Sequence, residues 1–324
     1  MREQTSHRSK SNVENMTDES NSDMAFEERP TVEGKPTWVD HCTEEAPGLK
    51  KALGRYIATH FVKYADGILL GPGTTSSCFT DQLIIYLTEN SFAWDLKISS
   101  TSQDVSKKWR FARAKEPGLF GNTQINQIGG ELLDALDCLV GQYAVDMINN
   151  DLFFPEMIIH GCATINLVGG GFRMGFQFQP ELSVQYALAT RPTSHRILAF
   201  DHSKFKPGGW NADISIKKLM SNTPLFTIIS TYPQDADQRE LVNEQFAGFK
   251  AILEGIVNSE IHGDASTSKS ELKLILINED GDAVRDLSLS ALRKKRRKDS
   301  QIEKTPGAAP FTPRNGSKYG GGRV

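Results

Sequence analysis

The chain has little cysteine and no long apolar run. Its four cysteines are widely spaced and form no CxxC pair: Cys42, Cys78, Cys138 and Cys162. A disulfide framework or a zinc site is therefore not expected, and a reducing compartment fits better. Because no apolar stretch approaches the length of a membrane span and the N-terminus lacks the apolar core of a signal peptide, we expect a cytoplasmic protein with no membrane contact and no bound metal.

Leucine and isoleucine are absent from residues 1–48, which are rich in Ser, Asn, Glu and Asp. Such a segment cannot bury enough apolar surface to offset the entropy of ordering. We therefore expect a disordered polar leader over 1–48, which could not build a helical DNA-reading domain. From Lys294 to the end the chain has no apolar periodicity and is rich in Gly, Pro, Lys and Arg, and we expect a disordered basic tail over 286–324.

The net charge of −3 over 324 residues argues against a molecule built as a whole to bind nucleic acid. One basic run lies in the tail: Arg293, Lys294, Lys295, Arg296, Arg297 and Lys298. This run could contact phosphates electrostatically, or it could be a solvated tail. No aromatic residue interrupts it, so base stacking is not indicated there.

The central region, 49–285, alternates between apolar helical periodicity and short apolar runs. Helices are predicted over 49–61, 78–87, 139–149, 181–189 and 239–257, and a polar loop over 107–122. Strands are predicted over 68–70, 92–98, 152–159, 196–200, 225–230 and 272–277, with a short one leading into Ile128. This alternation predicts an α/β domain with a mostly parallel sheet flanked by helices.

The most informative segment is the turn after the predicted strand 68–70, which reads Gly71-Pro72-Gly73-Thr74-Thr75. Glycines let the backbone turn tightly and approach a ligand, and the hydroxyl residues start the next helix. Free N–H groups at a helix start form a seat for a phosphate or carboxylate. An ordinary strand-to-helix turn is the alternative. Several polar or glycine-bearing turns follow predicted strands, where α/β sheets bind ligands.

Taken in order, these turns resemble the effector-binding domain of the DeoR family of bacterial sugar-metabolism regulators. The motifs are Gly73-Thr74-Thr75, Ile128-Gly129-Gly130-Glu131-Leu132, Gly161 with Ala163, and Asp201-His202-Ser203-Lys204-Phe205. The resemblance covers about residues 50–280 and implies the fold shared by ribose-phosphate isomerase, glucosamine-phosphate deaminase and CoA transferases. It also implies a phosphorylated sugar as ligand and no cofactor.

The resemblance also implies roles for particular residues. Gly73, Thr74 and Thr75 would hold the phosphate, and Lys204 would supply its countercharge unless it is an ordinary surface lysine. The sugar would lie close to four further residues: Gly129, Gly130, Gly161 and Asp201. Two departures from the family stand out: Gln185 occupies the place of its usual lysine, and no winged helix-turn-helix precedes the domain.

The function expected from this resemblance is that of a metabolite sensor, which passes ligand binding on through a homo-oligomer or a regulator partner. The alternative is a sugar-phosphate isomerase or amino-sugar-phosphate deaminase, with Asp134, Asp137 or His160 as the base. Asp134 and Asp137 are three residues apart and could equally mark the solvated face of a helix. His202 is expected to fill a turn by hydrogen bonding, and Glu131 matches the exposed glutamate of CoA transferases poorly.

Overall fold

An eight-stranded sheet organises the part of the chain that the computed structural model describes, which is residues 47–62, 65–91, 95–150, 154–168, 171–176, 178–205, 214–262 and 271–288. These residues all belong to one structural unit. The predicted leader up to residue 46 and the predicted tail beyond residue 288 lie outside the described residues, as does the basic run Arg293–Lys298.

The bounds of the elements are as follows. The helices are α2 (Pro47–His60), α3 (Thr74–Glu89), α4 (Gln103–Lys115), α5 (Pro117–Phe120), α6 (Gln142–Asn149), α7 (Gln179–Thr190), α8 (Ile216–Met220) and α9 (Ala236–His262). The strands are β1 (Gly67–Leu70), β2 (Lys97–Ser100), β3 (Gln124–Gln127), β4 (Glu131–Leu133), β5 (Cys138–Val140), β6 (Met157–His160), β7 (Thr164–Val168), β8 (Gly171–Gly175), β9 (His195–Phe200), β10 (Ile214–Ser215), β11 (Leu225–Thr231), β12 (Glu271–Ile277) and β13 (Ala283–Ser288).

The large sheet has the strand order β13-β12-β11-β9-β6-β1-β2-β3. Every neighbouring pair is parallel except β12 and β13, which are antiparallel. The predicted α/β class with a mostly parallel, helix-flanked sheet is therefore confirmed. Two small antiparallel sheets, β10-β8-β7 and β4-β5, complete the described strands.

The chain starts the sheet in its interior and winds outward in both directions. From β1 it runs through β2 to β3 at one edge, and from β6 it runs through β9 and β11 to β12 on the other side. The winding therefore reverses between β1 and β6, which pair in parallel with Ile68 opposite Met157. In open α/β sheets, ligands bind at the carboxyl ends of the strands that flank such a reversal.

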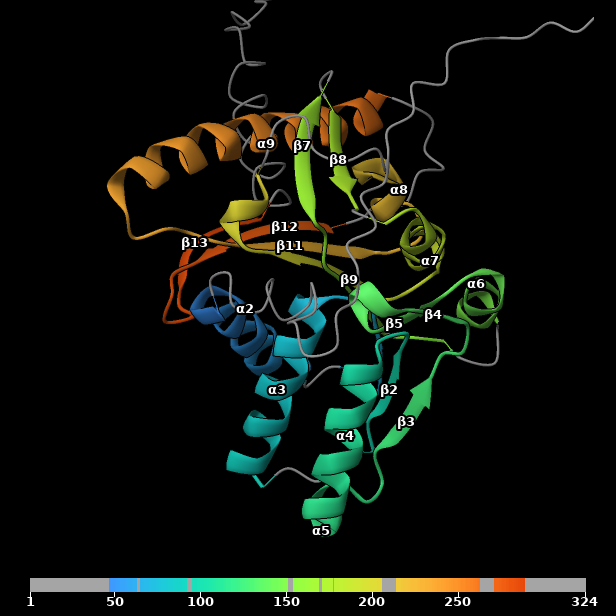
Figure 1. The fold of residues 1–324 in the computed structure, drawn as a ribbon. Coiled ribbons are helices and arrows are strands. Elements are labelled where there is room, and N and C mark those ends of the chain that lie inside the picture. The colour runs from blue at the N-terminus through green and yellow to red at the C-terminus, as the bar shows by residue number, and fades with distance from the viewer. Residues whose placement is uncertain are drawn as a thin grey trace, which may run out of the picture. The chain divides into compact units, whose positions relative to one another are not determined.

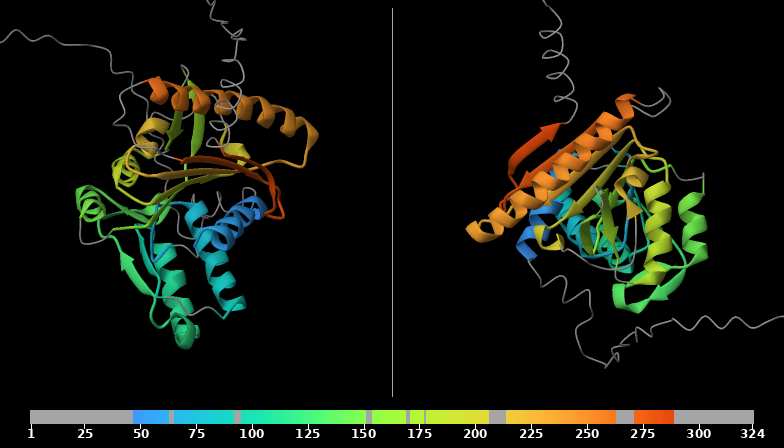
Figure 2. Two further views of the ribbon diagram at one scale, coloured as in Figure 1. Left: turned by 180° about the vertical axis from the view of Figure 1, so that it is seen from behind. Right: turned by 90° about the horizontal axis from the view of Figure 1, so that it is seen from above.

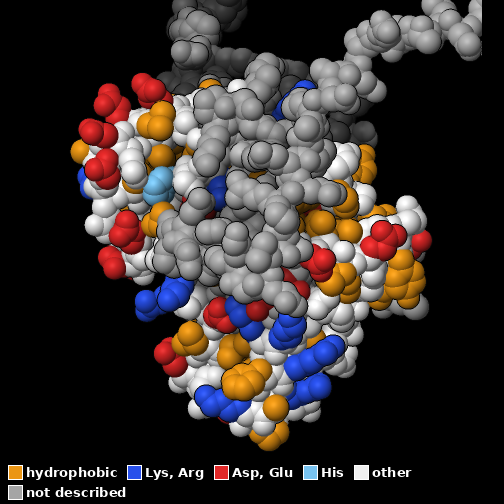
Figure 3. Space-filling model, in the orientation of Figure 1, with side chains coloured by type: hydrophobic (Ala, Val, Ile, Leu, Met, Phe, Trp, Pro, Cys, Tyr) orange, Lys and Arg blue, Asp and Glu red, His pale blue; other side chains and the backbone are white. Residues whose placement is uncertain are grey.

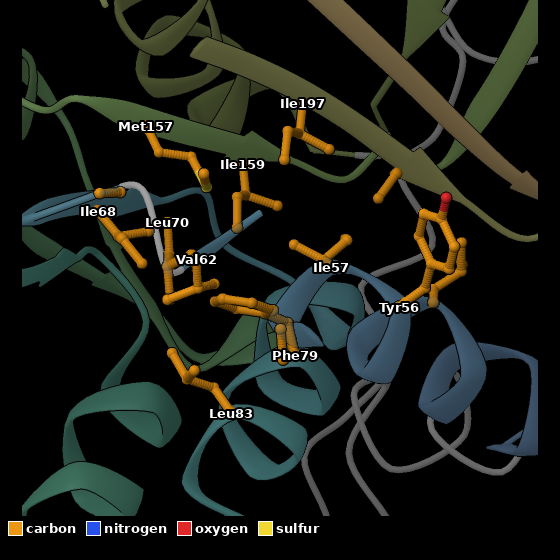
Figure 4. Packing of buried hydrophobic residues seen from close by; sticks show 14 of the residues in the cluster. Tyr56, Ile57, Val62, Ile68, Leu70, Phe79, Leu83, Met157, Ile159 and Ile197 are labelled. Atoms are coloured by element: carbon orange, nitrogen blue, oxygen red, sulfur yellow. The ribbon is translucent and has the colours of Figure 1, made fainter. Parts of the chain in front are cut away.

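Alternation along the strands divides the core between the two faces of the sheet. In β9, Ile197 and Ala199 join a cluster with α2 and α3, whereas Leu198 and Phe200 join a cluster with α8 and α9. Figures 1 and 2 show α2, α3 and α4 on one face and α9 with β7 and β8 on the other. Figure 4 shows the first cluster, where Phe79 of α3 packs beneath Leu70 and Ile159.

The predicted polar loop over 107–122 is wrong, because α4 and α5 occupy it. Val105, Trp109 and Ala112 recur at helical spacing and are buried, but they stand among so many charged residues that the periodicity is easily overlooked. The side chain of Ser102 caps α4 by accepting a hydrogen bond from the Val105 N–H at 3.4 Å. A capping serine before a buried i, i+4, i+7 series is the signal that predicts this helix.

The helix predicted over 139–149 is also partly wrong. Its start is strand β5, and α6 begins only at Gln142. Asp134 and Asp137 do not share a helix face either: Asp134 opens a 3-10 turn, and Asp137 ends that turn in the left-handed region with φ 45°. The other expected elements are present with shifted ends, although residues 92–94 and 151–153 of two predicted strands lie outside the described ranges.

Several elements were not anticipated, among them β4, β10 and α8. The β7–β8 hairpin follows the His160-Gly161 turn, and β13 continues the large sheet to Ser288, beyond the predicted limit at 285. None of the helices in the described ranges is both long and apolar enough to cross a bilayer.

Trp109 and Phe111 test the corrected assignment of α4, because they lie two residues apart on opposite sides of the helix. Trp109 is fully buried with its ring centroid 5.9 Å from that of Phe120, whereas Phe111 is 71% exposed. We expect Trp109→Ala to lower the free energy of unfolding by about 3–5 kcal/mol. Phe111→Ala should change it by less than about 0.5 kcal/mol. Urea unfolding measures both, and equal effects of the two substitutions would contradict the helix.

Candidate functional site

Three turns meet at the carboxyl ends of three adjacent strands, β1, β6 and β9. They are Gly71–Thr75 after β1, Gly161–Cys162 after β6, and Asp201–Lys204 after β9. The strands are neighbours in the sheet order β9-β6-β1 and run parallel, so their ends lie at one edge. The structure thus brings most of the sequence-predicted ligand residues to the place where the winding reverses.

The turn after β1 leads directly into α3. The Gly71 N–H donates to the Ile159 carbonyl of β6 at 3.0 Å, which continues the strand pairing into the turn. Gly73 is the N-cap residue with φ 112°, a conformation that favours glycine, and its side-chain position faces open space. The first amide of α3 with an intrahelical acceptor is that of Ser77, which donates to the Gly73 carbonyl at 3.2 Å. The amides of Thr74 to Ser76 precede it, as at any helix start.

The turn after β6 packs against this helix start. A Cβ atom placed on Gly161 would lie 3.4 Å from both Cβ and Oγ1 of Thr75. Thr75 is 8% exposed. The predicted phosphate residue Thr75 and the predicted sugar-proximal residue Gly161 are therefore in direct proximity, although 86 positions separate them in the sequence (161 − 75).

The turn after β9 contains a locally satisfied carboxylate and a half-buried lysine. Asp201 is buried, and its Oδ1 accepts hydrogen bonds from the N–H of Ser203 at 3.1 Å and from the Ser203 hydroxyl. Burial raises the pKa of the Cys162 thiol, whereas the charge of Lys204 acts in the opposite direction. Lys204 therefore lies within electrostatic range of the β6 turn, as a countercharge for a ligand there would need to be.

The glycines after β3 have a packing role. A Cβ on Gly129 would lie 2.7 Å from the Tyr143 ring, and one on Gly130 would lie 2.3 Å from the Val140 carbonyl oxygen. Gly130 also has φ 154°. Contact with α6 and β5 therefore explains both glycines without a ligand, and their predicted proximity to a sugar stays a prediction.

Buried polar atoms without partners gather at the carboxyl edge. Among the described residues, three buried hydroxyl oxygens near strand ends have no hydrogen-bond partner: Ser76 Oγ, Thr101 Oγ1 and Thr164 Oγ1. Their residues come from the first turn of α3, the end of β2 and the start of β7. Because an unpaired buried polar atom costs about 1–3 kcal/mol, such a concentration marks a place where a polar ligand or water belongs.

His160 is held as a neutral ring. Its Nε2 faces the Nη1 atom of Arg196 at 2.9 Å, and because a guanidinium only donates, Nε2 accepts and the proton lies on Nδ1. Burial, and to a smaller extent the charge of Arg196, lowers the pKa of His160 well below its ordinary value. A side-chain hydrogen bond with Gln185 raises this pKa, but by less. With its accepting nitrogen already occupied, His160 is a poor candidate for the predicted general base.

Glu181 was not anticipated from the sequence. This residue lies in the first turn of α7, is 7% exposed, and accepts a hydrogen bond from Gln185 Nε2 at 3.0 Å. Burial raises its pKa from 4.5 to about 7, against the smaller effect of the Gln185 hydrogen bond. Its charge contributes to raising the pKa of Cys162 and, with burial, that of Cys138 to about 12. A glutamate that binds and releases a proton near neutral pH thus lies beside the β6 turn.

Gln185 connects Glu181 to the predicted phosphate loop. Its Oε1 would lie 3.6 Å from a Cβ atom on Gly71. The residue that takes the place of the family's lysine is therefore completely buried behind the turn. Nothing in the local sequence distinguishes Glu181 from an exposed residue of an amphipathic helix, which is why only the packing identifies it.

The remaining candidate acids and bases have other partners. His202 turns toward β11, where its Nδ1 lies 2.9 Å from Thr231 Oγ1 and its Nε2 lies 3.2 Å from Gln238 Oε1. This is the expected hydrogen-bonding role. Asp137 pairs with Lys107 at 3.3 Å beside the small β4–β5 sheet. No group of three or more potential metal-ligating side chains occurs in the described ranges.

A groove of about 730 Å³ lies away from this edge. Its lining includes Asp66, Lys97, Gln124 and Glu156, which lie at or just before the amino ends of β1, β2, β3 and β6. The opposite ends of the same strands carry the predicted phosphate loop. The unpartnered buried hydroxyl groups and the start of α3 lie at those strand ends as well.

No family model matches the sequence, and no curated protein matches it. Solved structures that it resembles include ribose 5-phosphate isomerase from Plasmodium falciparum, with 17% identity and a TM-score of 0.31, covering 49% of this chain and 55% of that one. Another is ribose 5-phosphate isomerase A from Methanocaldococcus jannaschii, with 13% identity, a TM-score of 0.31 and 48% and 54% coverage. The enzyme from Neisseria gonorrhoeae has 14% identity, a TM-score of 0.27 and 49% and 53% coverage. Each match covers about half of either chain, and at these TM-scores the likeness supports no inference about activity.

Glu181 should make stability depend on pH. Because folding raises the pKa of its carboxyl group from 4.5 to about 7, the folded state binds the proton more tightly, and the free energy of unfolding falls as pH rises through that interval. Between pH about 4 and about 8, the free energy of unfolding of wild type should fall by about 3 kcal/mol more than that of Glu181→Gln. In this variant the amide oxygen at position 181 still accepts a hydrogen bond from Gln185. Urea unfolding measures this difference. Glu89→Gln, on the exposed end of α3, is the control, and parallel profiles for Glu181→Gln and wild type would refute the raised pKa.

Proposed function

We propose that this protein binds a phosphorylated sugar, or a related phosphorylated metabolite, at the carboxyl ends of β1, β6 and β9. The phosphate would lie at the start of α3, against the amides and hydroxyls of Thr74 and Thr75, with Lys204 as its countercharge. The sugar would lie toward Gly161, where the absence of a side chain lets a ligand approach the backbone closely. In keeping with the resemblance to the DeoR family, the protein would act as a sensor that passes ligand binding to a partner subunit or regulator.

The observation that carries this proposal is the group of buried polar atoms without partners at one edge of the sheet. The hydroxyl groups of Ser76, Thr101 and Thr164 can each donate and accept a hydrogen bond. A ligand with a phosphate and several hydroxyl groups both donates and accepts hydrogen bonds, so it matches a mixed set of this kind better than a purely apolar ligand does.

A second candidate function, a sugar-phosphate isomerase or deaminase, is favoured by Glu181. Such reactions move a proton at the carbon next to a carbonyl, and the side chain that does so works best with a pKa near the operating pH. Glu181 has a pKa of about 7, whereas His160 has its accepting nitrogen occupied and Asp137 is paired with Lys107. If the protein is an enzyme, Glu181 is therefore the base that we propose, in place of Asp134, Asp137 or His160.

A thermal-shift screen of sugar phosphates tests the binding site. A ligand at 100 times its dissociation constant should stabilise wild type by about 2.7 kcal/mol. Lys204→Ala and Thr75→Val should each weaken binding by about tenfold to a hundredfold, because each removes one partner of a charged group. The unphosphorylated sugar should give no shift.

The control is Lys217→Ala, which removes an exposed lysine of α8 far along the chain from the predicted loop. It should bind the ligand as wild type does. An equal loss in Lys217→Ala and Lys204→Ala would show nonspecific attraction of anions. The absence of a shift with every phosphorylated sugar would refute the ligand assignment.

Turnover separates the two candidate functions. We expect any sugar phosphate that produces a shift to be recovered unchanged after long incubation, as measured by NMR, because a sensor only binds its ligand. Conversion to the isomer or release of ammonia would favour the enzyme instead. In that case Glu181→Gln should retain binding and lower the rate about 10²–10⁴-fold, as loss of a general base does.

A further inference from the structure

The outward face of α4 is strongly basic. The helix contains Lys107, Lys108, Arg110, Arg113 and Lys115 and one carboxylate, Asp104, in a chain whose net charge is −3. Figure 3 shows Lys and Arg side chains gathered over α4, with hydrophobic side chains between them. The positive charge of the described residues is thus concentrated locally, even though the molecule as a whole is slightly acidic.

Part of this charge is free of partners. Lys108 is bound by Asp81 at 2.8 Å and by Asp104 at 3.1 Å, and Lys107 pairs with Asp137 at 3.3 Å. Within the described ranges, Arg110, Arg113 and Lys115 are exposed and make no ion pair or hydrogen bond through their side chains. These three cations lie within six positions and raise the local positive potential. They form no ion pair within the described ranges that would stabilise the fold.

An exposed aromatic ring lies among these cations. Phe111 is 71% exposed, more than any other large hydrophobic side chain of the described residues. It lies one turn from Lys107 and from Lys115 on the helix face opposite buried Trp109, and Arg110 and Arg113 lie further round the exposed side of the helix. Because the core of α4 is already filled by Trp109 and Ala112, the ring contributes nothing to the packing of the domain.

We propose that the α4 surface, formed by Lys107, Arg110, Phe111, Arg113 and Lys115, binds single-stranded nucleic acid. The cations would contact phosphates, and the Phe111 ring would stack on an unpaired base. Arginine suits this role because its planar group binds phosphate oxygens in pairs and also stacks on bases.

The aromatic ring favours this partner over other polyanions. An acidic peptide or a sulfated polysaccharide would satisfy the cations but would gain little from an exposed ring. An anionic membrane would need a broad apolar face, and the other apolar side chains of α4, Val105, Trp109 and Ala112, are buried in the core. Only a single strand offers phosphates and accessible flat bases together.

Fluorescence anisotropy of a labelled oligo-dT, titrated with the full chain over a range of salt concentrations, tests the proposal. Arg110→Ala/Arg113→Ala should reduce the slope of log affinity against log salt by about 1.4, since each lost phosphate contact removes about 0.7. The matched control is Lys51→Ala/Arg55→Ala, which removes two exposed cations one turn apart on α2 and should leave the slope unchanged. Equal changes in the two double variants would overturn the proposal.

Phe111 variants isolate the stacking. Phe111→Leu should weaken oligo-dT binding about tenfold, whereas Phe111→Tyr, which keeps the ring, should not. Heparin, an anionic polymer without bases, is the second probe. Arg110→Ala/Arg113→Ala should weaken heparin binding, whereas Phe111→Leu should leave it unchanged. If Phe111→Leu leaves oligo-dT binding unchanged, or if wild type binds heparin but not oligo-dT, the partner is a polyanion without bases and the proposal fails. Thermal melting confirms that each variant is folded.

Discussion

The parallel pairing of β1 with β6 is the constraint on which the rest of the structure depends. In this pairing Leu70 lies opposite Ile159, and the Gly71 N–H extends the ladder by one more bond. All other strands of the large sheet are added outward from this pair in two directions. Because the two turns that follow β1 and β6 leave the sheet side by side, the start of α3 and Gly161 must meet, and the apolar residues below them form the core in Figure 4.

Each end of helix α7, which packs against the carboxyl edge of the large sheet, lies close to a buried ionisable side chain. Glu181 lies in its first turn, and buried Arg196 of β9 donates to the carbonyls of Leu188 at 2.5 Å and Arg191 at 2.6 Å at its last turn. A carboxylate near the first turn of a helix and a guanidinium near its last turn both interact favourably with the helix dipole. Arg196 thus has backbone carbonyls instead of a carboxylate as its partners, and burial lowers its pKa to about 9. His160 and Gln185 lie between these two charged groups, so the polarity of the edge is part of how α7 packs.

The two helices that carry the proposed binding surfaces are in direct contact. Helices α3 and α4 begin at the same edge of the sheet, after β1 and β2. The Ser77 hydroxyl, one turn into α3, donates to Asp104 of α4 at 2.6 Å, and Lys108 donates to Ser77 and to Asp81. A ligand that shifts the start of α3 would therefore act directly on these bonds to α4.

The sequence by itself determined the α/β class, because apolar runs and helical periodicity alternate along the chain, and it located the strand-end turns, because Gly73-Thr74-Thr75 and Asp201–Lys204 directly follow apolar runs. It did not reveal α4, whose buried Trp109 series is masked by charge, or the 3-10 turn that separates Asp134 from Asp137. Only the tertiary structure decided which turns are neighbours and which polar residues are buried. Glu181 acquires its raised pKa, and Gln185 its place behind Gly71, from packing against residues distant in sequence. Local patterns carry no information about such contacts, since burial and strand order are properties of the assembled sheet.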